Sequence, residues 1–252
     1  NVYELPWYLV IGEPGSGKTE AIRHSNINFP PGLQDLLQGT GGTVNMNWWF
    51  SDDSVILDTA GRMVFDDVET GGTEEWKEFL HLLRKNRPNC PINGVLLVIP
   101  ADTLIKDSLE EVEQKASKIA MQFDVIQRTL DVRFPVYVVI SKCDLIQGFR
   151  DFFDDLNSHT EQNQIFGWSN PEPLDEQYNS QSVDDYFQSI RSWLNRRKFA
   201  LIEDDLAQDS FTASRKPEFY FSFPSHLASI SGKLKSYLDK VFSTSRTWSC
   251  KP

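Results

Sequence analysis

The chain has 252 residues, a formal net charge of −11 and an ordinary apolar fraction of 40%, so it suits one α/β domain with insertions, or one domain with a small appendage. The acidic balance argues against nucleic-acid binding, and no segment approaches the roughly 20 apolar residues of a membrane span. Three cysteines, none in a metal-binding spacing, fit a reducing compartment.

Strand-like and helix-like segments alternate along the chain, which predicts a mostly parallel sheet with helices on both faces. The expected strands are residues 7–11, 54–57, 94–99, 136–140 and 219–223. Residues 95–99 are apolar throughout, as a central strand covered on both faces requires. Residues 48–50 and a tight turn at 51–53 predict an antiparallel hairpin at one edge of the sheet.

The longest expected helix spans residues 108–130. Ser108 and Glu111 have the spacing of a capping box. The apolar residues that follow at intervals of three and four form one stripe: Leu109, Val112, Ala116, Ile119, Phe123, Ile126 and Leu130. Further helices are expected at 18–26, 74–87, 183–199 and 226–242. Polar residues 157–181 predict a surface insertion, and 183–242 a helical extension, within a single domain over 1–252.

Residues 12–19 read G-E-P-G-S-G-K-T, which is the pattern of a phosphate-binding P-loop, and they follow an apolar strand. The glycines allow backbone N–H groups to point inward at phosphate oxygens, where the dipole of the next helix adds positive potential. Lys18 can reach the β- and γ-phosphates, and the Thr19 hydroxyl can ligate Mg²⁺. The predicted nucleotide-binding residues of this loop are Gly12, Glu13, Pro14, Gly15, Ser16, Gly17, Lys18 and Thr19.

Two more segments are expected to complete the phosphate and metal site. The motif D-T-A-G at 58–61 follows a strand, so Asp58 can hold a Mg²⁺-bound water and the Gly61 N–H can reach the γ-phosphate. The glycine-rich loop 39–43 carries Thr40 and Thr43, of which Thr43 lies nearer the next strand and is our choice for closing the Mg²⁺ shell. The predicted metal ligands are therefore Thr19, Thr43 and Asp58.

Residues 141–144 read S-K-C-D and follow the strand at 136–140, in the place where GTPases carry [NT]-K-x-D. The Asp144 carboxylate would accept two hydrogen bonds from guanine, and the stem of Lys142 would cover the base. Ser141 replaces the usual Asn or Thr but keeps a hydroxyl. The sequence therefore predicts GTP as the cofactor, with ATP left open, and a further base contact from Pro224 and Ser225.

Hydrolysis would depend on the residue after D-T-A-G. Many GTPases place a Gln there, whereas this chain has Arg62, which cannot act as a base but could neutralise charge on the transferring phosphate. The predicted catalytic residues are Lys18, Arg62 and Thr43. We expect slow turnover, so that the nucleotide acts as a switch or a structural ligand.

These motifs together resemble the cytoplasmic N-terminal region of the IcmF/TssM family, inner-membrane components of bacterial type VI secretion systems with relatives in type IVB systems. The resemblance rests on L-P-W-Y-L-V-I-G at 5–12, the P-loop, G-G-T at 41–43, W-W-F at 48–50, D-T-A-G-R at 58–62 and K-C-D-L at 142–145. The double tryptophan beside D-T-A-G-R is the most specific element. The resemblance implies a Ras-like P-loop fold with extra C-terminal helices.

The resemblance also implies a location at the cytoplasmic face of the inner membrane, tethered by segments outside this sequence, and we expect the sequence to be part of a longer protein. The implied partners are a TssL-like component of the membrane complex and the secretion baseplate. Two departures from the family pattern are V-N-M-N at 44–47, where a basic and an acidic residue are expected, and Ser141 for Thr. A targeting GTPase of the signal-recognition-particle type and a non-hydrolysing interaction module remain alternatives.

Overall fold

The structure is a computed structural model that describes residues 3–25, 27–29, 46–66, 72–153, 156, 166–173, 176–207 and 217–243. Backbone contacts divide the chain into two compact units, which we describe separately. The first comprises Asn1–Pro100, Gln114–Ser141 and Lys240–Pro252, and the second comprises Ala101–Glu113 and Lys142–Asp239.

The first unit contains a mixed five-stranded sheet in the order β2-β3-β1-β4-β5. Its strands are β1 (Trp7–Gly12), β2 (Asn47–Phe50), β3 (Val55–Asp58), β4 (Gly94–Pro100) and β5 (Val136–Ser141). The pairs β1–β3, β1–β4 and β4–β5 are parallel, whereas β2 runs antiparallel to β3 at the edge. The predicted edge hairpin and four of the five predicted strands are therefore confirmed.

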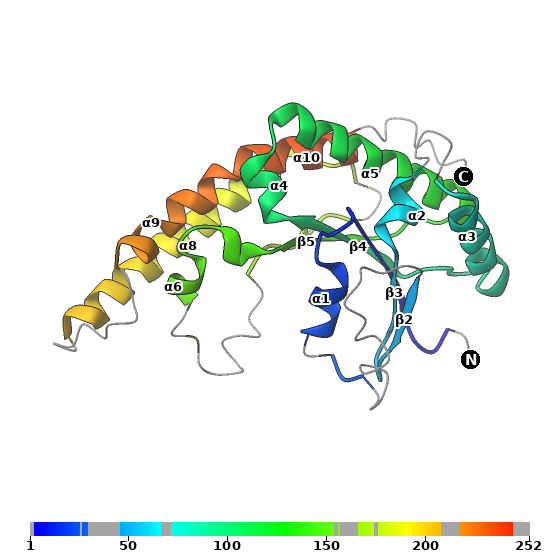
Figure 1. The fold of residues 1–252 in the computed structure, drawn as a ribbon, viewed down its shortest axis with the longest axis horizontal. Coiled ribbons are helices and arrows are strands. Elements are labelled where there is room, and N and C mark those ends of the chain that lie inside the picture. Colours follow the sequence, from blue (N-terminus) through cyan, green and yellow to red (C-terminus); the bar gives the residue numbers. More distant parts are fainter. Residues whose placement is uncertain are drawn as a thin grey trace. The chain divides into compact units, whose positions relative to one another are not determined.

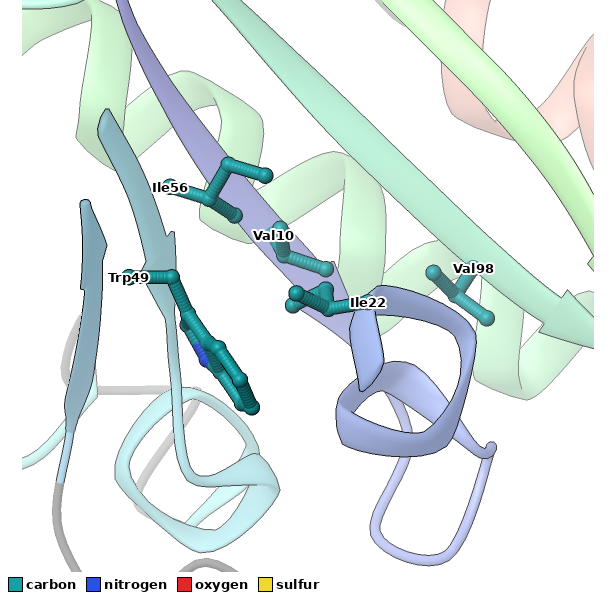
Figure 2. Packing of buried hydrophobic residues seen from close by; sticks show 5 residues of the cluster. All are labelled: Val10, Ile22, Trp49, Ile56 and Val98. Atoms are coloured by element: carbon teal, nitrogen blue, oxygen red, sulfur yellow. The ribbon is translucent and has the colours of Figure 1, made fainter. Parts of the chain in front are cut away.

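One face of the sheet packs against α1 (Lys18–Arg23). Figure 2 shows the five buried residues that meet there, namely Val10, Ile22, Trp49, Ile56 and Val98. Strand residues alternate between the two faces, so Val10, Trp49, Ile56 and Val98 come from the face of the sheet that α1 covers. Partly buried Phe29 lies against it, with its ring centroid 5.2 Å from that of Trp49.

The two adjacent tryptophans of β2 serve opposite faces for the same reason. Trp49 is fully buried on the α1 side, while Trp48 lies edge-on to Trp7 at 5.4 Å and to Phe79 of α3 (Glu74–Asn86) at 6.3 Å. Figure 1 shows α1 on one side of the sheet and α5 (Leu109–Leu130) on the other. The double tryptophan thus contributes one ring to each layer of the core.

Helix α5 begins with the capping box that the sequence predicted. The Ser108 N–H donates to Glu111 Oε2 at 2.7 Å, and the Glu111 N–H donates to Ser108 Oγ at 3.2 Å. The predicted apolar stripe is buried from Val112 to Leu130, whereas Leu109 is 51% exposed. On the same side of the sheet, the Trp76 indole N–H donates to Gln122 Oε1 at 2.9 Å, which joins α3 to α5.

The second unit is helical in the part of the chain that the structure describes. It contains α4 (Ala101–Lys106), the 3₁₀ turn η3 (Cys143–Leu145), α6 (Phe149–Phe153), α8 (Ser180–Ala207), α9 (Pro217–Ser229) and most of α10 (Ser231–Ser243). Residues 157–165 and 174–175 of the predicted insertion lie outside the described residues. No described helix in either unit is both long and apolar enough to cross a membrane.

The expected strand at 219–223 is wrong, because these residues form part of α9. The aromatic run suggested a strand, but the buried residues Phe223, Leu227 and Ile230 recur with helical spacing. Phe223 is fully buried, with its ring 4.9 Å from that of Phe152 in α6. The single helix expected at 226–242 is also wrong, since α9 ends at Ser229 and α10 begins at Ser231.

Candidate phosphate and metal site

The glycine-rich loop joins the central strand β1 to α1, and its glycines meet separate geometric demands. Gly15 and Gly17 have φ values of 74° and 84°, in the left-handed region that favours glycine. A Cβ on Gly12 would lie 2.5 Å from the Val98 carbonyl oxygen of β4. The loop therefore keeps its path only with glycine at these positions.

Lys18 is the first residue of α1 and is only 6% exposed. Its Nζ donates to the carbonyl oxygens of Gly12 at 2.8 Å and Glu13 at 3.0 Å. Burial lowers the pKa of Lys18 to about 8, although the nearby carboxylates of Asp58 and Glu13 partly oppose this. The ammonium is thus held by the backbone of the loop that precedes α1.

Asp58 ends β3, and its side chain meets the first turn of α1. The Thr19 hydroxyl donates to Asp58 Oδ2 at 2.7 Å, although 39 residues separate the two in sequence. Asp58 is fully buried, and burial raises the pKa of its carboxyl. The Thr19 hydroxyl and the Lys18 ammonium partly oppose this increase. The polar groups of Trp49 and Asn47 also lower the pKa of the carboxyl.

The second carboxylate oxygen of Asp58, Oδ1, is also buried. It has no hydrogen-bond partner of good geometry among the described residues, although the polar groups of Trp49 and Asn47 lie near enough to lower the pKa of the carboxyl. A buried carboxylate with an unsatisfied oxygen is costly unless it is paired or coordinates a metal. A hydroxyl beside a carboxylate supplies the oxygen ligands that Mg²⁺ prefers, so Thr19 and Asp58 fit a magnesium site.

The end of D-T-A-G also lies against the loop. Gly61 begins α2 (Gly61–Phe65), and a Cβ there would lie 2.6 Å from the Pro14 backbone nitrogen. Thr59 is fully buried and donates its hydroxyl to the Val10 carbonyl oxygen at 2.7 Å. The structure therefore brings Gly61 and the loop together.

Ser141, expected at the base-binding position, lies at the end of β5 and supports the loop. Its hydroxyl donates to the Ser16 carbonyl oxygen at 2.6 Å, across 125 residues of sequence. Ser16 is itself 1% exposed. This contact fixes the backbone just before Lys18, and a threonine hydroxyl could make the same bond.

Sequence reasoning missed one partner of the loop. Lys115 of α5 forms an ion pair with Glu13, with 2.9 Å between Nζ and Oε2. Glu13 is 14% exposed at its side chain, and its Oε1 is buried with no hydrogen-bond partner among the described residues. No spacing rule links residues 13 and 115, so only the tertiary fold reveals this contact.

Lys142 and Asp144 belong to the second unit. Lys142 has a left-handed backbone with φ of 54°, and its Nζ lies 3.4 Å from an Asp102 carboxylate oxygen. Asp144 is exposed and accepts a hydrogen bond from Arg150 Nη2 at 2.9 Å. Between them, Cys143 has a pKa raised to about 11, mainly by burial, so its thiol stays protonated at neutral pH.

The remaining predicted site residues are Thr43, Arg62 and the pair Pro224 and Ser225. Thr43 and the rival Thr40 lie outside the described residues. Arg62 is an exposed residue of α2. The expectation that Pro224 and Ser225 form a base-contacting loop after a strand is wrong, because both residues lie within α9.

The fold and site define an α/β protein in which a glycine-rich loop joins the central strand β1 to α1. The model of the IcmF-related N-terminal domain matches residues 69–249, so the chain belongs to that family. A curated relative, the type VI secretion system component TssM1 of Pseudomonas aeruginosa, is 37% identical over 246 residues. That match covers 96% of this chain but 22% of the relative, so the chain spans about a fifth of its length.

Proposed function

We propose that this chain is a nucleotide-binding domain of a type VI secretion protein of the TssM kind, with a Ras-like P-loop fold. It would bind GTP, or ATP, together with Mg²⁺. The observation that carries the proposal is the bond from the Thr19 hydroxyl to buried Asp58, whose second oxygen has no hydrogen-bond partner in the part of the chain that the structure describes. Buried Lys18 lies in the same loop and supplies positive charge.

Each residue has a separate role in this proposal. Lys18 would exchange its bonds to loop carbonyls for bonds to phosphate oxygens, and the loop amides would donate to the same group. Thr19, Asp58 and Thr43 would hold Mg²⁺ directly or through water. The ion, when bound, neutralises charge on the phosphate oxygens.

Base selection would rest on Asp144, with Lys142 and Ser141 beside it in sequence. Asp144 is paired with Arg150 at a side-chain exposure of 43% and 78%, respectively. Exposed ion pairs of this kind contribute little, roughly 0–1 kcal/mol, so guanine could displace Arg150 at small cost. The carboxylate is therefore accessible for the two hydrogen bonds that distinguish guanine from adenine.

We propose slow hydrolysis, since Arg62 stands where many GTPases carry a water-orienting glutamine. The bound nucleotide would then act as a switch or scaffold for assembly of the secretion complex. A TssL-like component and the baseplate are the proposed partners, at the cytoplasmic face of the inner membrane. The family match favours this role over a targeting GTPase of the signal-recognition-particle type.

One observation favours a second candidate, a non-hydrolysing interaction module. Lys18 already bonds to the carbonyl oxygens of Gly12 and Glu13, so the loop is closed on itself by its own lysine. A loop stabilised in this way could keep its shape as a structural element. The two candidates differ in whether Lys18 exchanges these bonds for bonds to a phosphate ligand.

Calorimetric titration of GTP and ATP, with and without Mg²⁺, tests the proposal. Lys18→Ala is expected to abolish binding, and Asp144→Asn to weaken GTP selectively. Lys77→Ala is the matched control, because Lys77 is a lysine of α3 that pairs with exposed Glu74. If GTP and ATP bind with equal affinity and Asp144→Asn changes neither, the site recognises phosphates only. Absence of binding by the unaltered chain would favour the interaction module.

Turnover is tested separately by a single-turnover assay with purified protein. Unassisted switch GTPases hydrolyse orders of magnitude more slowly than roughly one per second. A rate above that value without a partner would contradict the proposed switch or scaffold role.

A further inference from the structure

Strand β5 forms an edge of the sheet, and no described strand lies on its outer side. The Val95 N–H of β4 donates to the Pro135 carbonyl at 3.0 Å, in register with the pairing of Val95 and Val136. In a parallel ladder alternate residues bond to the same neighbour, so the N–H and C=O groups of Val136 and Val138 point away from β4.

The side chains of this edge are those of an interior strand. Strand β5 reads V-Y-V-V-I-S and carries neither a charge nor a proline, the usual protections of an exposed edge. Tyr137 is 49% exposed and Val138 is 38% exposed. Adjacent strand residues lie on opposite faces, so both faces of the sheet leave apolar surface uncovered beside β5.

We propose that a sixth strand pairs in parallel with the outer edge of β5, and that it comes from the same polypeptide, after residue 252. The chain spans about a fifth of its curated relative, so a longer polypeptide is the natural source. The exposed Tyr137 and Val138 call for an extended segment with apolar residues on both of its faces. This inference is independent of the proposed nucleotide binding.

The handedness of crossovers supports this source. Parallel strands are joined by right-handed crossovers, and α5 connects β4 to β5 across one face of the sheet. A right-handed crossover from β5 to a sixth strand beyond it would place its connecting helix on the same face of the sheet as α5. The last residues of α10 lie there, since the ring of Phe242 is 6.3 Å from that of Phe123 in α5. The chain is thus placed to add a strand beside β5.

Residue-resolved hydrogen exchange on the purified full-length protein tests the pairing. If the sixth strand is present, the Val138 amide should exchange within about tenfold of the inward-pointing Tyr137 and Val139 amides, which serve as internal controls. Exchange of Val138 more than about a hundredfold faster than both would mean an open edge and would overturn the proposal.

Photocrosslinking in the full-length protein identifies the source of the strand. A p-benzoylphenylalanine at position 137 replaces an exposed aromatic residue, and the same substitution at Phe50, on the opposite edge of the sheet, is the control. The expected product is an intramolecular link from position 137 to a peptide after residue 252, absent from the control. A dimer-sized product, a link to a segment before residue 1, or protection that disappears on dilution would each overturn the proposal.

Discussion

The buried ammonium of Lys18 predicts how nucleotide affinity depends on pH. With a pKa of about 8, Lys18 is roughly nine-tenths charged near pH 7 and roughly one-quarter charged near pH 8.5. A phosphate ligand binds the charged form, so the dissociation constant should rise roughly fourfold over this interval. A lysine with an ordinary pKa of 10.5 would change by only a few per cent.

The assay is calorimetric titration of a Mg²⁺-loaded, non-hydrolysable nucleotide across this pH range, in buffers of differing ionisation enthalpy. Binding near pH 8 should also take up protons from the buffer, because the phosphate raises the pKa of Lys18. Lys18→Arg is the matched control, since a guanidinium stays charged and any residual affinity should not vary. A flat profile for the unaltered chain, or the same slope in Lys18→Arg, would refute the reasoning.

Three further predictions concern the same site. Asp58→Asn should remove the Mg²⁺-dependent part of nucleotide affinity. It should leave the melting temperature of the nucleotide-free chain equal or higher, because burial raises the pKa of Asp58 and thus disfavours its charged form. A clear loss of stability would contradict this. Gly12→Ala should lower the melting temperature by several degrees, since the new Cβ would lie 2.5 Å from a carbonyl oxygen, whereas Gly232→Ala meets nothing within 4 Å and should be neutral or slightly stabilising. Ser141→Ala should cost about 1 kcal/mol in chemical denaturation by removing the bond to Ser16, and Ser141→Thr should retain most of it; equal losses in both would exclude the hydroxyl as the cause.

Local sequence patterns determined much of the sheet and the loop. The apolar runs of β1, β3, β4 and β5 are short and continuous, so their strand character did not depend on distant partners. The glycine spacing before Lys18 is likewise a local requirement, because positive φ at Gly15 and Gly17 is a property of the backbone itself. The Ser108–Glu111 capping box joins residues three apart for the same reason.

Tertiary contacts decided the features that the sequence left open or misled us on. Residues 219–223 favour a strand by composition, but burial of Phe223 against Phe152 and its neighbours stabilises a helix instead. The ion pair of Lys115 with Glu13 and the bond of Ser141 to Ser16 join positions more than 100 residues apart. No local pattern encodes such pairs.

The candidate site combines both kinds of information. The sequence by itself supplied the chemical groups, namely the loop glycines, Lys18, Thr19 and Asp58, since their types and spacing match the pattern from which a phosphate and Mg²⁺ site is predicted. Only the folded sheet decided that Thr19 and Asp58 touch, because β1 and β3 are neighbours in space with 39 residues between the two side chains. Burial, which shifts the pKa values of Lys18 and Asp58, likewise arises only when the layers of the sheet and its helices pack together.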